Sequence, residues 1–210
     1  MLKDFQLASI DAFNDVAKKY EDTIGSLSNY DHCYDRMVSM INDHDRILDL
    51  ACGPGNVSRY IGLRRRVSIT GYDLADSMLE TAKRNVPDGT FLKRSIVDFE
   101  EDNKFDWIIN SFGFPFLDRG QRLKCIECCS RALKTGGHLY LSFMDGNREG
   151  YEKTCFTGDK KIYFIYHDKK EVLCELKKNR FETIDEWELD FDGGNGKFLK
   201  DVVFILRKTT

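Results

Sequence analysis

Proline is scarce in this sequence, and neither sign of charge is in large excess. Among 210 residues there are 3 prolines, 32 Lys and Arg residues and 35 Asp and Glu residues, which gives a formal net charge of −3. The lack of proline argues against a proline-rich linker or tail. The near-balance of charge excludes the broad basic field of a dedicated nucleic-acid-binding protein, so we expect no nucleic-acid partner.

Long apolar runs and a secretory leader are also missing. No run reaches the roughly 18–20 apolar residues that a membrane helix requires, and the first residues show no apolar stretch followed by a small-residue cleavage site. The 7 cysteines are scattered, which indicates reduced thiols rather than a disulfide framework. We expect a soluble, cytoplasmic protein without a membrane partner, and the sequence does not indicate its oligomeric state.

Cys125, Cys128 and Cys129 raise the question of a metal site. They have helical spacing inside an apolar stripe, and no second pair of metal ligands stands nearby in the sequence. This arrangement favours thiols packed in a core, so we expect no metal.

Strands and helices alternate through the middle of the sequence. Five strands are expected, at 47–50, 67–72, 90–92, 105–110 and 138–143. Helices are expected at 77–85 and 119–133, and a shorter one follows the first strand. Two helical stripes lie in the first forty residues, separated by a turn-rich segment at 25–29. This order predicts a mostly parallel α/β sheet covered by helices on both faces.

The last third departs from this alternation. Residues 161–166 alternate as in a strand, and Asp168 with Glu171 forms a capping-box pattern before another helix. Two strands at 181–189 and 201–206 are joined through the glycine-rich segment 192–196. That connection predicts an antiparallel hairpin at the end of the chain.

A glycine-rich loop at 49–56 follows the first expected strand and precedes a helix, which is the setting of a nucleotide-binding turn. Gly53 and Gly55 lack a Cβ atom, so the backbone there can turn sharply and approach a ligand. Asp49 stands at the strand end, where a carboxylate would repel a pyrophosphate. It suits instead a ligand with a cationic amine or sulfonium.

Two more acids follow the next strands. Asp73 ends the second strand, and an acid roughly 20 residues past a glycine loop is placed to accept hydrogen bonds from both hydroxyls of a ribose. Asp98 follows the third strand, where it would accept from an adenine amino group while Phe99 donates its backbone N–H. All three acids fall at carboxyl ends of strands, the edge at which open α/β sheets bind ligands.

Together these segments resemble the class I S-adenosylmethionine (SAM)-dependent methyltransferases of the small-molecule type. The likeness rests on 47–56, 71–82, 95–99, 105–112 and 132–139, which span most of 46–143. The helix and hairpin of 168–206 match the usual ending of the family, and 17–21 resembles the helical lid phrase of many small-molecule members.

The resemblance implies a Rossmann-like fold, a doubly wound and mostly parallel seven-stranded sheet with N-terminal helices and a C-terminal antiparallel hairpin. It implies one domain, 1–210. Within it, 1–42 would form a helical N-terminal cap, 46–143 the cofactor-binding core, and 144–210 the acceptor-side segment with the terminal hairpin.

The resemblance also assigns a site for SAM, with S-adenosylhomocysteine (SAH) as the product. The methionine end would lie on Ala51, Gly53 and the backbone of Asn110, Ser111 and Phe112. Asp73 would bind the ribose, Leu74 and Met78 would lie beside the adenine, and Asp98 and Phe99 would contact its edge. Ala51 replaces the first loop glycine of the family; since alanine is small and tolerates ordinary backbone angles, we expect SAM binding to survive.

The methyl acceptor is not identified by the sequence. Methyl transfer from a sulfonium is an in-line displacement that depends mainly on positioning, and a general base is needed only for an acceptor protonated at the working pH. We therefore assign no catalytic residue. Candidates for lining the acceptor pocket are Tyr20, Tyr30, Tyr166 and His167. Phe114 and Phe116 would either line that pocket or pack in the core.

Other functions stay open. A protein or nucleic-acid methyltransferase is disfavoured by the charge balance and because 110–113 lacks the Asn/Asp-Pro-Pro-aromatic phrase of base-amino methyltransferases. A regulatory SAM-binding domain without turnover would keep the same cofactor acids. An NAD-dependent enzyme is disfavoured by Asp49.

Overall fold

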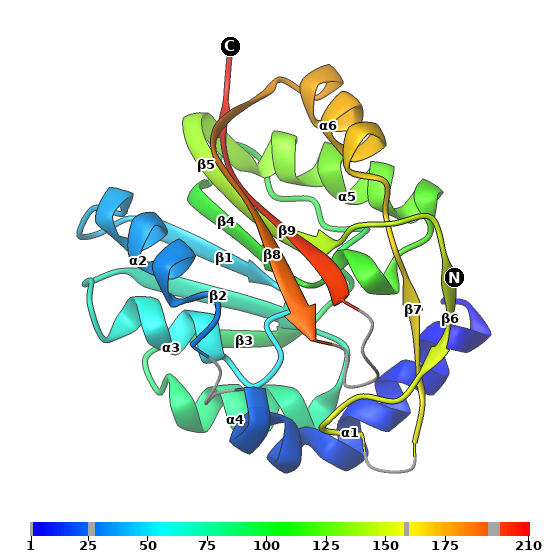
Figure 1. The fold of residues 1–210 in the computed structure, drawn as a ribbon. Helices are drawn as coiled ribbons and strands as arrows, with labels where there is room; N and C mark the ends of the chain where they lie inside the picture. The colour runs from blue at the N-terminus through cyan, green and yellow to red at the C-terminus, as the bar shows by residue number, and fades with distance from the viewer. Residues whose placement is uncertain (1, 25–27, 158–159, 193–197) are drawn as a thin grey trace.

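The computed structural model describes residues 2–24, 28–157, 160–192 and 198–210 (Figure 1). Its main sheet has seven strands in the order β3-β2-β1-β4-β5-β9-β8. These are β1 (Arg46–Leu50), β2 (Ser68–Asp73), β3 (Thr90–Lys93), β4 (Phe105–Ser111), β5 (Leu133–Met144), β8 (Phe181–Asp192) and β9 (Phe198–Lys208). The first five are parallel, and β9 runs antiparallel to β5 and to β8. The predicted sheet and its terminal antiparallel pair are confirmed, although most of the connection, 193–196, lies outside the described residues.

Helices cover both faces of this sheet (Figure 1). They are α1 (Asp4–Ile24), α2 (Asp31–Met40), α3 (Asn56–Gly62), α4 (Asp76–Asn85), α5 (Arg119–Ala132), α6 (Lys169–Lys178) and the short 3-10 helix η1 (Phe114–Phe116). One face packs on α2, α3 and α4 through Met37, Ile61 and Leu79. The other packs on α5 and α6 through Ile126 and Leu176. No helix in these segments combines the length and apolar composition needed to cross a bilayer.

Helix α1 lies against α4 and β7, outside the main layers. Asn14 of α1 accepts a hydrogen bond from the backbone N–H of Ser77 at 3.0 Å, which fixes α1 to the first turn of α4. Beside α1, β6 (Glu149–Glu152) pairs antiparallel with β7 (Ile162–Ile165) in a separate small sheet. Strand β7 agrees with the alternation at 161–166. β6 was not predicted, because its sequence Glu-Gly-Tyr-Glu has no apolar alternation.

The structure corrects two local expectations. β5 begins at Leu133, so residues 134–137, which lie between the helix expected at 119–133 and the strand expected at 138–143, belong to the strand. The pairing shifts register between Phe105 and Trp107, and a Cβ atom on Gly137 would lie 3.0 Å from Asp106 O, so the bulge requires glycine. Asp168 caps α6 by accepting from Glu171 N at 2.9 Å. The Glu171 side chain instead accepts from Arg122 Nη2 at 3.4 Å. The predicted capping box is therefore only half formed, by the Asp168 side chain.

Candidate functional site

A cavity lies where the carboxyl ends of β1, β2, β3 and β4 meet α1 and η1. It holds about 860 Å³ of space between protein atoms, part of it open to solvent. Figure 1 shows α1, in blue, running past this edge of the sheet. The loops after the four strands form its floor, and α1 and η1 supply the opposite wall.

The loop after β1 has three residues with positive φ: Ala51 (53°), Gly53 (52°) and Gly55 (78°). A Cβ atom on Gly53 would meet nothing within 4 Å, so this glycine leaves the cavity floor open. Gly55 lies away from the cavity, and its Cβ would approach Ala82 Cβ at 3.2 Å. The assumption of ordinary backbone angles at Ala51 is wrong, because the tight turn places it in the left-handed region.

Asp49 is buried beneath this loop, with 2% of its surface exposed. Its Oδ2 accepts a hydrogen bond from Ser58 Oγ at 2.6 Å. The pKa of Asp49 is raised to about 7, mainly by burial; the hydrogen bond from Ser58 lowers it, and the nearby Asp73 raises it. Asp49 is not among the lining residues, so it lies beneath the floor of the cavity and not in contact with its interior.

Asp73 lines the cavity and connects the two loops at its floor. One carboxylate oxygen accepts from Gly53 N at 2.8 Å, and the other accepts from Ala75 N at 2.9 Å. Burial raises its pKa above the ordinary value, and these backbone hydrogen bonds lower it. Each oxygen keeps further acceptor capacity, which fits a ligand that presents two neighbouring hydroxyl groups. Leu74 and Met78 lie beside it on the lining.

The structure does not bring Asp98 and Phe99 to the cavity. The lining residues after β3 are Arg94, Ser95, Ile96 and Val97, because the strand already ends at Lys93. Asp98 is exposed to solvent, and the buried Phe99 ring packs edge-on against Tyr72 at 6.0 Å between centroids. We therefore replace these two residues by Ser95 and Ile96 as the expected contacts of an adenine edge.

After β4, Ser111, Phe112 and Gly113 line the cavity, and Asn110 supports them from below. Asn110 is fully buried, and its Oδ1 accepts from Gly113 N at 3.0 Å. Phe112 has a positive φ of 58°, held by hydrogen bonds from its N–H to the backbone and hydroxyl oxygens of Ser142, both at 3.1 Å. Asn110 was predicted to contact the methionine end of SAM through its backbone. In the structure it instead positions Gly113, which lines the cavity.

Of the four acceptor candidates, only Tyr20 lines the cavity. Its ring packs edge-on against Phe156 at 4.7 Å and Phe13 at 5.8 Å between centroids. Within the described residues its hydroxyl has no hydrogen-bond partner, so it is available to a ligand. Tyr30 stands behind the wall, with its ring 5.3 Å from that of Phe112.

Tyr166 and His167 serve the structure elsewhere. Tyr166 donates to Glu152 at 2.9 Å. His167 is 2% exposed, and burial lowers its pKa to about 4, so the ring is neutral. Its Nε2 then donates to Phe114 O at 2.8 Å, and its Nδ1 accepts from Arg122 Nη1 at 2.7 Å. Neither residue reaches the cavity, and the acceptor role is withdrawn for both.

Sequence reasoning named Tyr20 of α1 and Phe116 of η1 as candidates for this wall, but it missed the other residues that α1 supplies. Gln6, Ile10 and Phe13 of α1 line the cavity together with Phe116, whereas Phe114 packs in the core. Gln6 Nε2 donates to Phe116 O at 2.8 Å, which joins the two parts of the wall. The apolar stripe of α1 was visible in the sequence, but nothing there indicated which layer it covers.

No cluster of metal-ligating side chains occurs in the described segments. Cys125, Cys128 and Cys129 are buried in the core beneath α5, as their helical spacing predicts.

Comparisons with known proteins agree with this geometry. A family described as "Methyltransferase domain" matches residues 47–137. The chain is 33% identical over 162 residues to demethylmenaquinone methyltransferase from Thermotoga maritima, covering 73% of this chain and 66% of that protein. It is 32% identical over 106 residues to trans-aconitate 2-methyltransferase from Rhizobium rhizogenes, covering 50% of this chain and 41% of that protein. The chain therefore spans less than two thirds of either relative.

Solved structures show the same fold at lower identity. A SAM-dependent methyltransferase from Methanosarcina mazei superposes with a TM-score of 0.72 at 19% identity, covering 83% of this chain and 97% of that one. A Burkholderia thailandensis 1,6-didemethyltoxoflavin-N1-methyltransferase, solved with SAH, gives 0.72 at 13% identity, covering 100% of this chain and 92% of that one. With its strand order, its glycine loop and these matches, the chain has the fold of the class I SAM-dependent methyltransferases, and residues 47–137 belong to the methyltransferase domain family.

Proposed function

We propose that this protein transfers the methyl group of SAM to a small, uncharged and largely aromatic acceptor. The observation that carries the proposal is the division of the cavity lining. The charged lining residues are Asp73, the last residue of β2, and Arg94, which follows β3, whereas aromatic rings line the side formed by α1, η1 and the loop after β4.

The first half of the cavity fits the adenosyl part of SAM. Asp73 presents two carboxylate oxygens for the ribose hydroxyls. Leu74, Met78 and Ile96 supply apolar surface for the faces of an adenine. Gly53 leaves room for close approach of the methionine part, and Asp49 beneath the loop favours its cationic groups in the ionised form.

The second half of the cavity is aromatic. Phe13, Tyr20, Phe112 and Phe116 come from three separate segments and line it together. The faces of such rings stabilise a neighbouring sulfonium by cation–π attraction, and they pack well against a planar acceptor. The Tyr20 hydroxyl is the polar group available to orient a substituent of that acceptor.

This lining distinguishes between the two kinds of acceptor named for the relatives, demethylmenaquinone and trans-aconitate. An acceptor with several carboxylates would need a free cation in the cavity. Arg94 is the cationic side chain of the lining, and it is bound to Glu101 at 2.9 Å and to Tyr72 Oη at 3.1 Å. The aromatic lining therefore favours an uncharged ring.

Positioning would account for most of the rate. SAM supplies an activated methyl group, and the protein holds the acceptor in line with it, an effect worth about 7–11 kcal/mol of the barrier. The described lining holds no His, Lys or Glu. An acceptor whose attacking atom carries no proton at the working pH would need no general base.

Thermal-shift measurements with SAM, SAH and NAD test the cofactor half. We expect SAM and SAH to raise the melting temperature, and stabilisation by NAD alone would contradict the proposal. Asp73→Asn should abolish the shift, whereas Asp98→Asn, which changes an exposed acid outside the cavity, should leave it intact.

Transfer from methyl-labelled SAM into a fractionated cell extract tests the acceptor half. The label should enter uncharged aromatic compounds of low mass. Label in protein or nucleic acid would support the macromolecular alternatives, and binding without any transfer would support a regulatory domain. All 7 cysteines, which lie within the described segments, are free, in keeping with the reducing cytoplasm that we propose as the location.

A further inference from the structure

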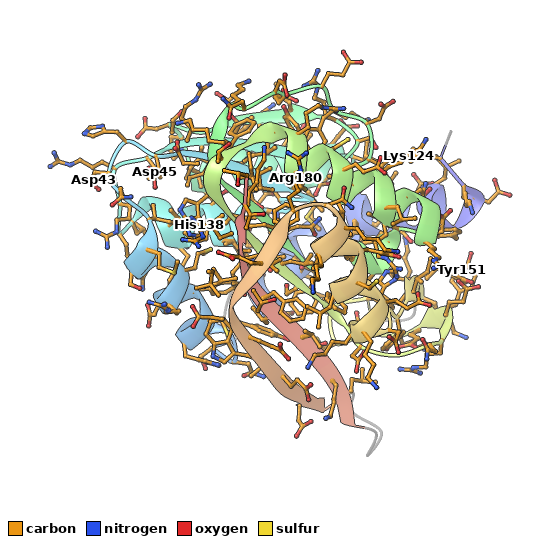
Figure 2. All side chains as sticks on the ribbon, turned by 90° about the horizontal axis from the view of Figure 1, so that it is seen from above. Asp43, Asp45, Lys124, His138, Tyr151 and Arg180 are labelled. Atoms are coloured by element: carbon orange, nitrogen blue, oxygen red, sulfur yellow. The ribbon has the colours of Figure 1, made fainter. Side chains whose placement is uncertain are left out.

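A second hollow lies at the opposite edge of the sheet, where the parallel strands begin. It is formed by residues 62–69, which lead from α3 into β2, and by residues 85–89, which precede β3. In Figure 2, Asp43 and Asp45 in the loop before β1 mark this flank, and Tyr151 of β6 lies on the opposite flank. A partner bound here would leave the cavity of the methyltransferase site open.

Basic side chains gather in this hollow. Its lining includes His44, Arg59, Arg65 and Arg66. Arg64 stands next to Arg65 in the sequence but is not part of the lining. We call these residues, together with Leu63, the arginine groove. One acid, Asp88, also lines it, and Asp43 receives the backbone N–H of Arg66 at 3.1 Å. The cations exceed the acids, although the chain as a whole carries a net charge of −3.

None of these arginines forms an ion pair within the part of the chain that the structure describes. Arg64 and Arg65 donate instead to backbone carbonyl groups, those of Tyr60 at 3.2 Å and Val38 at 3.0 Å. Some cations on other surfaces are paired: Lys169 and Lys200, for example, both contact Glu188. The guanidinium groups of the groove therefore keep most of their donors for an external anion.

Leu63 stands at the rim of the groove and is 72% exposed, more than any other large apolar side chain described. An exposed leucine among arginines combines the two features of a surface that attaches to anionic lipid: cations for the headgroups and an apolar side chain for the acyl boundary. Arginine also matches phosphate oxygens with two parallel N–H donors.

We propose that the arginine groove binds the phosphate headgroups of an anionic membrane surface, with Leu63 inserted between the lipids. This proposal does not depend on methyl transfer, and it revises the expectation from the sequence that no membrane partner exists. With four arginines and one leucine, attachment is weak and reversible, and it is sensitive to salt.

Flotation of the full chain with vesicles tests this proposal. At low salt the protein should float with vesicles of phosphatidylglycerol and phosphatidylcholine but not with phosphatidylcholine alone, and high salt should release it. Each cation near such a surface contributes about fivefold to partitioning, so Arg59→Ala/Arg66→Ala should weaken binding about 25-fold. Leu63→Ser should weaken it about tenfold without removing the salt dependence.

The matched control is Lys177→Ala/Lys178→Ala, which removes the same charge from the exposed end of α6 and should change binding little. An equal loss in this variant would overturn the proposal, because it would reveal a general charge effect. Release of the protein from the vesicles by 1 mM inorganic phosphate would also overturn the proposal, because it would assign the groove to a soluble anion. Retention of RNA by a protein that does not bind vesicles would overturn it as well. SAH binding, measured for each variant, verifies that the fold is intact.

Discussion

Tyr30 donates a hydrogen bond to Asp201 across a distance of 2.5 Å, joining the start of α2 to β9. Asp201 is only 4% exposed, and burial raises its pKa to about 6 although the Tyr30 hydrogen bond lowers it. The ring of Tyr30 also packs edge-on against Phe112, which lines the cavity. Through these contacts a buried acid holds an element of the cavity wall.

Tyr30→Phe should therefore destabilise the fold in a pH-dependent way. At pH 7.5, where Asp201 is ionised, the loss of a hydrogen bond to a buried charge should lower the free energy of unfolding by about 1.5–3 kcal/mol. At pH 5 the acid is mostly protonated, and the loss should fall to about 0.5–1.5 kcal/mol. Urea unfolding at both pH values measures the difference. Tyr151→Phe, at a 53% exposed tyrosine, is the control and should change little at either pH.

Asp201 itself should influence how stability depends on pH. Its folded pKa of about 6 lies above the ordinary 3.8, so the native state retains a proton that the unfolded chain releases. Its contribution to stability is therefore full below about pH 4 and is lost as the pH rises through about 6. In Asp201→Asn this decline should disappear from a series of urea titrations between pH 4 and 7. Unchanged pH dependence would mean that the acid is not perturbed.

The alternation of apolar strands and helices was sufficient to predict the sheet, because β1, β2 and β4 are short, largely buried and each followed by a helix. The strand-end rule also placed Asp73 correctly at the cavity edge. It misplaced Asp98, since β3 ends at Lys93 and the next four residues, not the following acid, face the cavity. The error arose from choosing a residue by its chemistry instead of by its position after the strand.

The rest of the site depends on contacts between distant segments. His167 looked like an acceptor residue, but Arg122 from α5 and the carbonyl of Phe114 occupy both of its ring nitrogens. Ala51 gave no sign of its φ of 53°, which follows from the turn that closes the loop on β2. Neither property can be read from local sequence, because each is imposed by residues far along the chain.

The charge of Asp49 should control the preference for SAM over SAH. Since burial raises its pKa to about 7, SAM affinity should increase as the pH rises from 6 to 8, because the ionised acid favours a sulfonium. SAH lacks that charge, so its affinity should vary less. Asp49→Asn should weaken SAM several-fold at pH 8 and remove this pH dependence, as measured by calorimetric titration. A variant that keeps the wild-type pH dependence would show that another group is responsible.

Ala51→Gly should stabilise the protein. A left-handed conformation costs a non-glycine residue about 1–2 kcal/mol, part of which the greater freedom of glycine in the unfolded chain offsets. We expect a gain of about 1 kcal/mol, seen as a higher melting temperature. The same substitution at Ala12, in the interior of α1, should instead cost about 1 kcal/mol or more. An equal loss of stability in Ala51→Gly and Ala12→Gly would contradict the left-handed backbone conformation at Ala51.

Arg122 and Glu175 form a buried ion pair between α5 and α6, with two hydrogen bonds at 2.7 and 2.6 Å. Arg122→Met leaves the carboxylate of Glu175 buried without its partner and removes the donor to His167, so it should cost about 3–5 kcal/mol of unfolding free energy. Arg119, whose side chain is 71% exposed, approaches the same carboxylate at 3.7 Å. Arg119→Met should cost less than about 1 kcal/mol.

The double variant Arg122→Met/Glu175→Leu separates two explanations of that loss. If the cost in Arg122→Met comes from an unpaired buried charge, removing the second charge should restore most of the stability. Guanidinium unfolding of the single and double variants gives the coupling energy between the two residues. A double variant as unstable as the sum of its single variants would instead show that the two side chains act by packing alone.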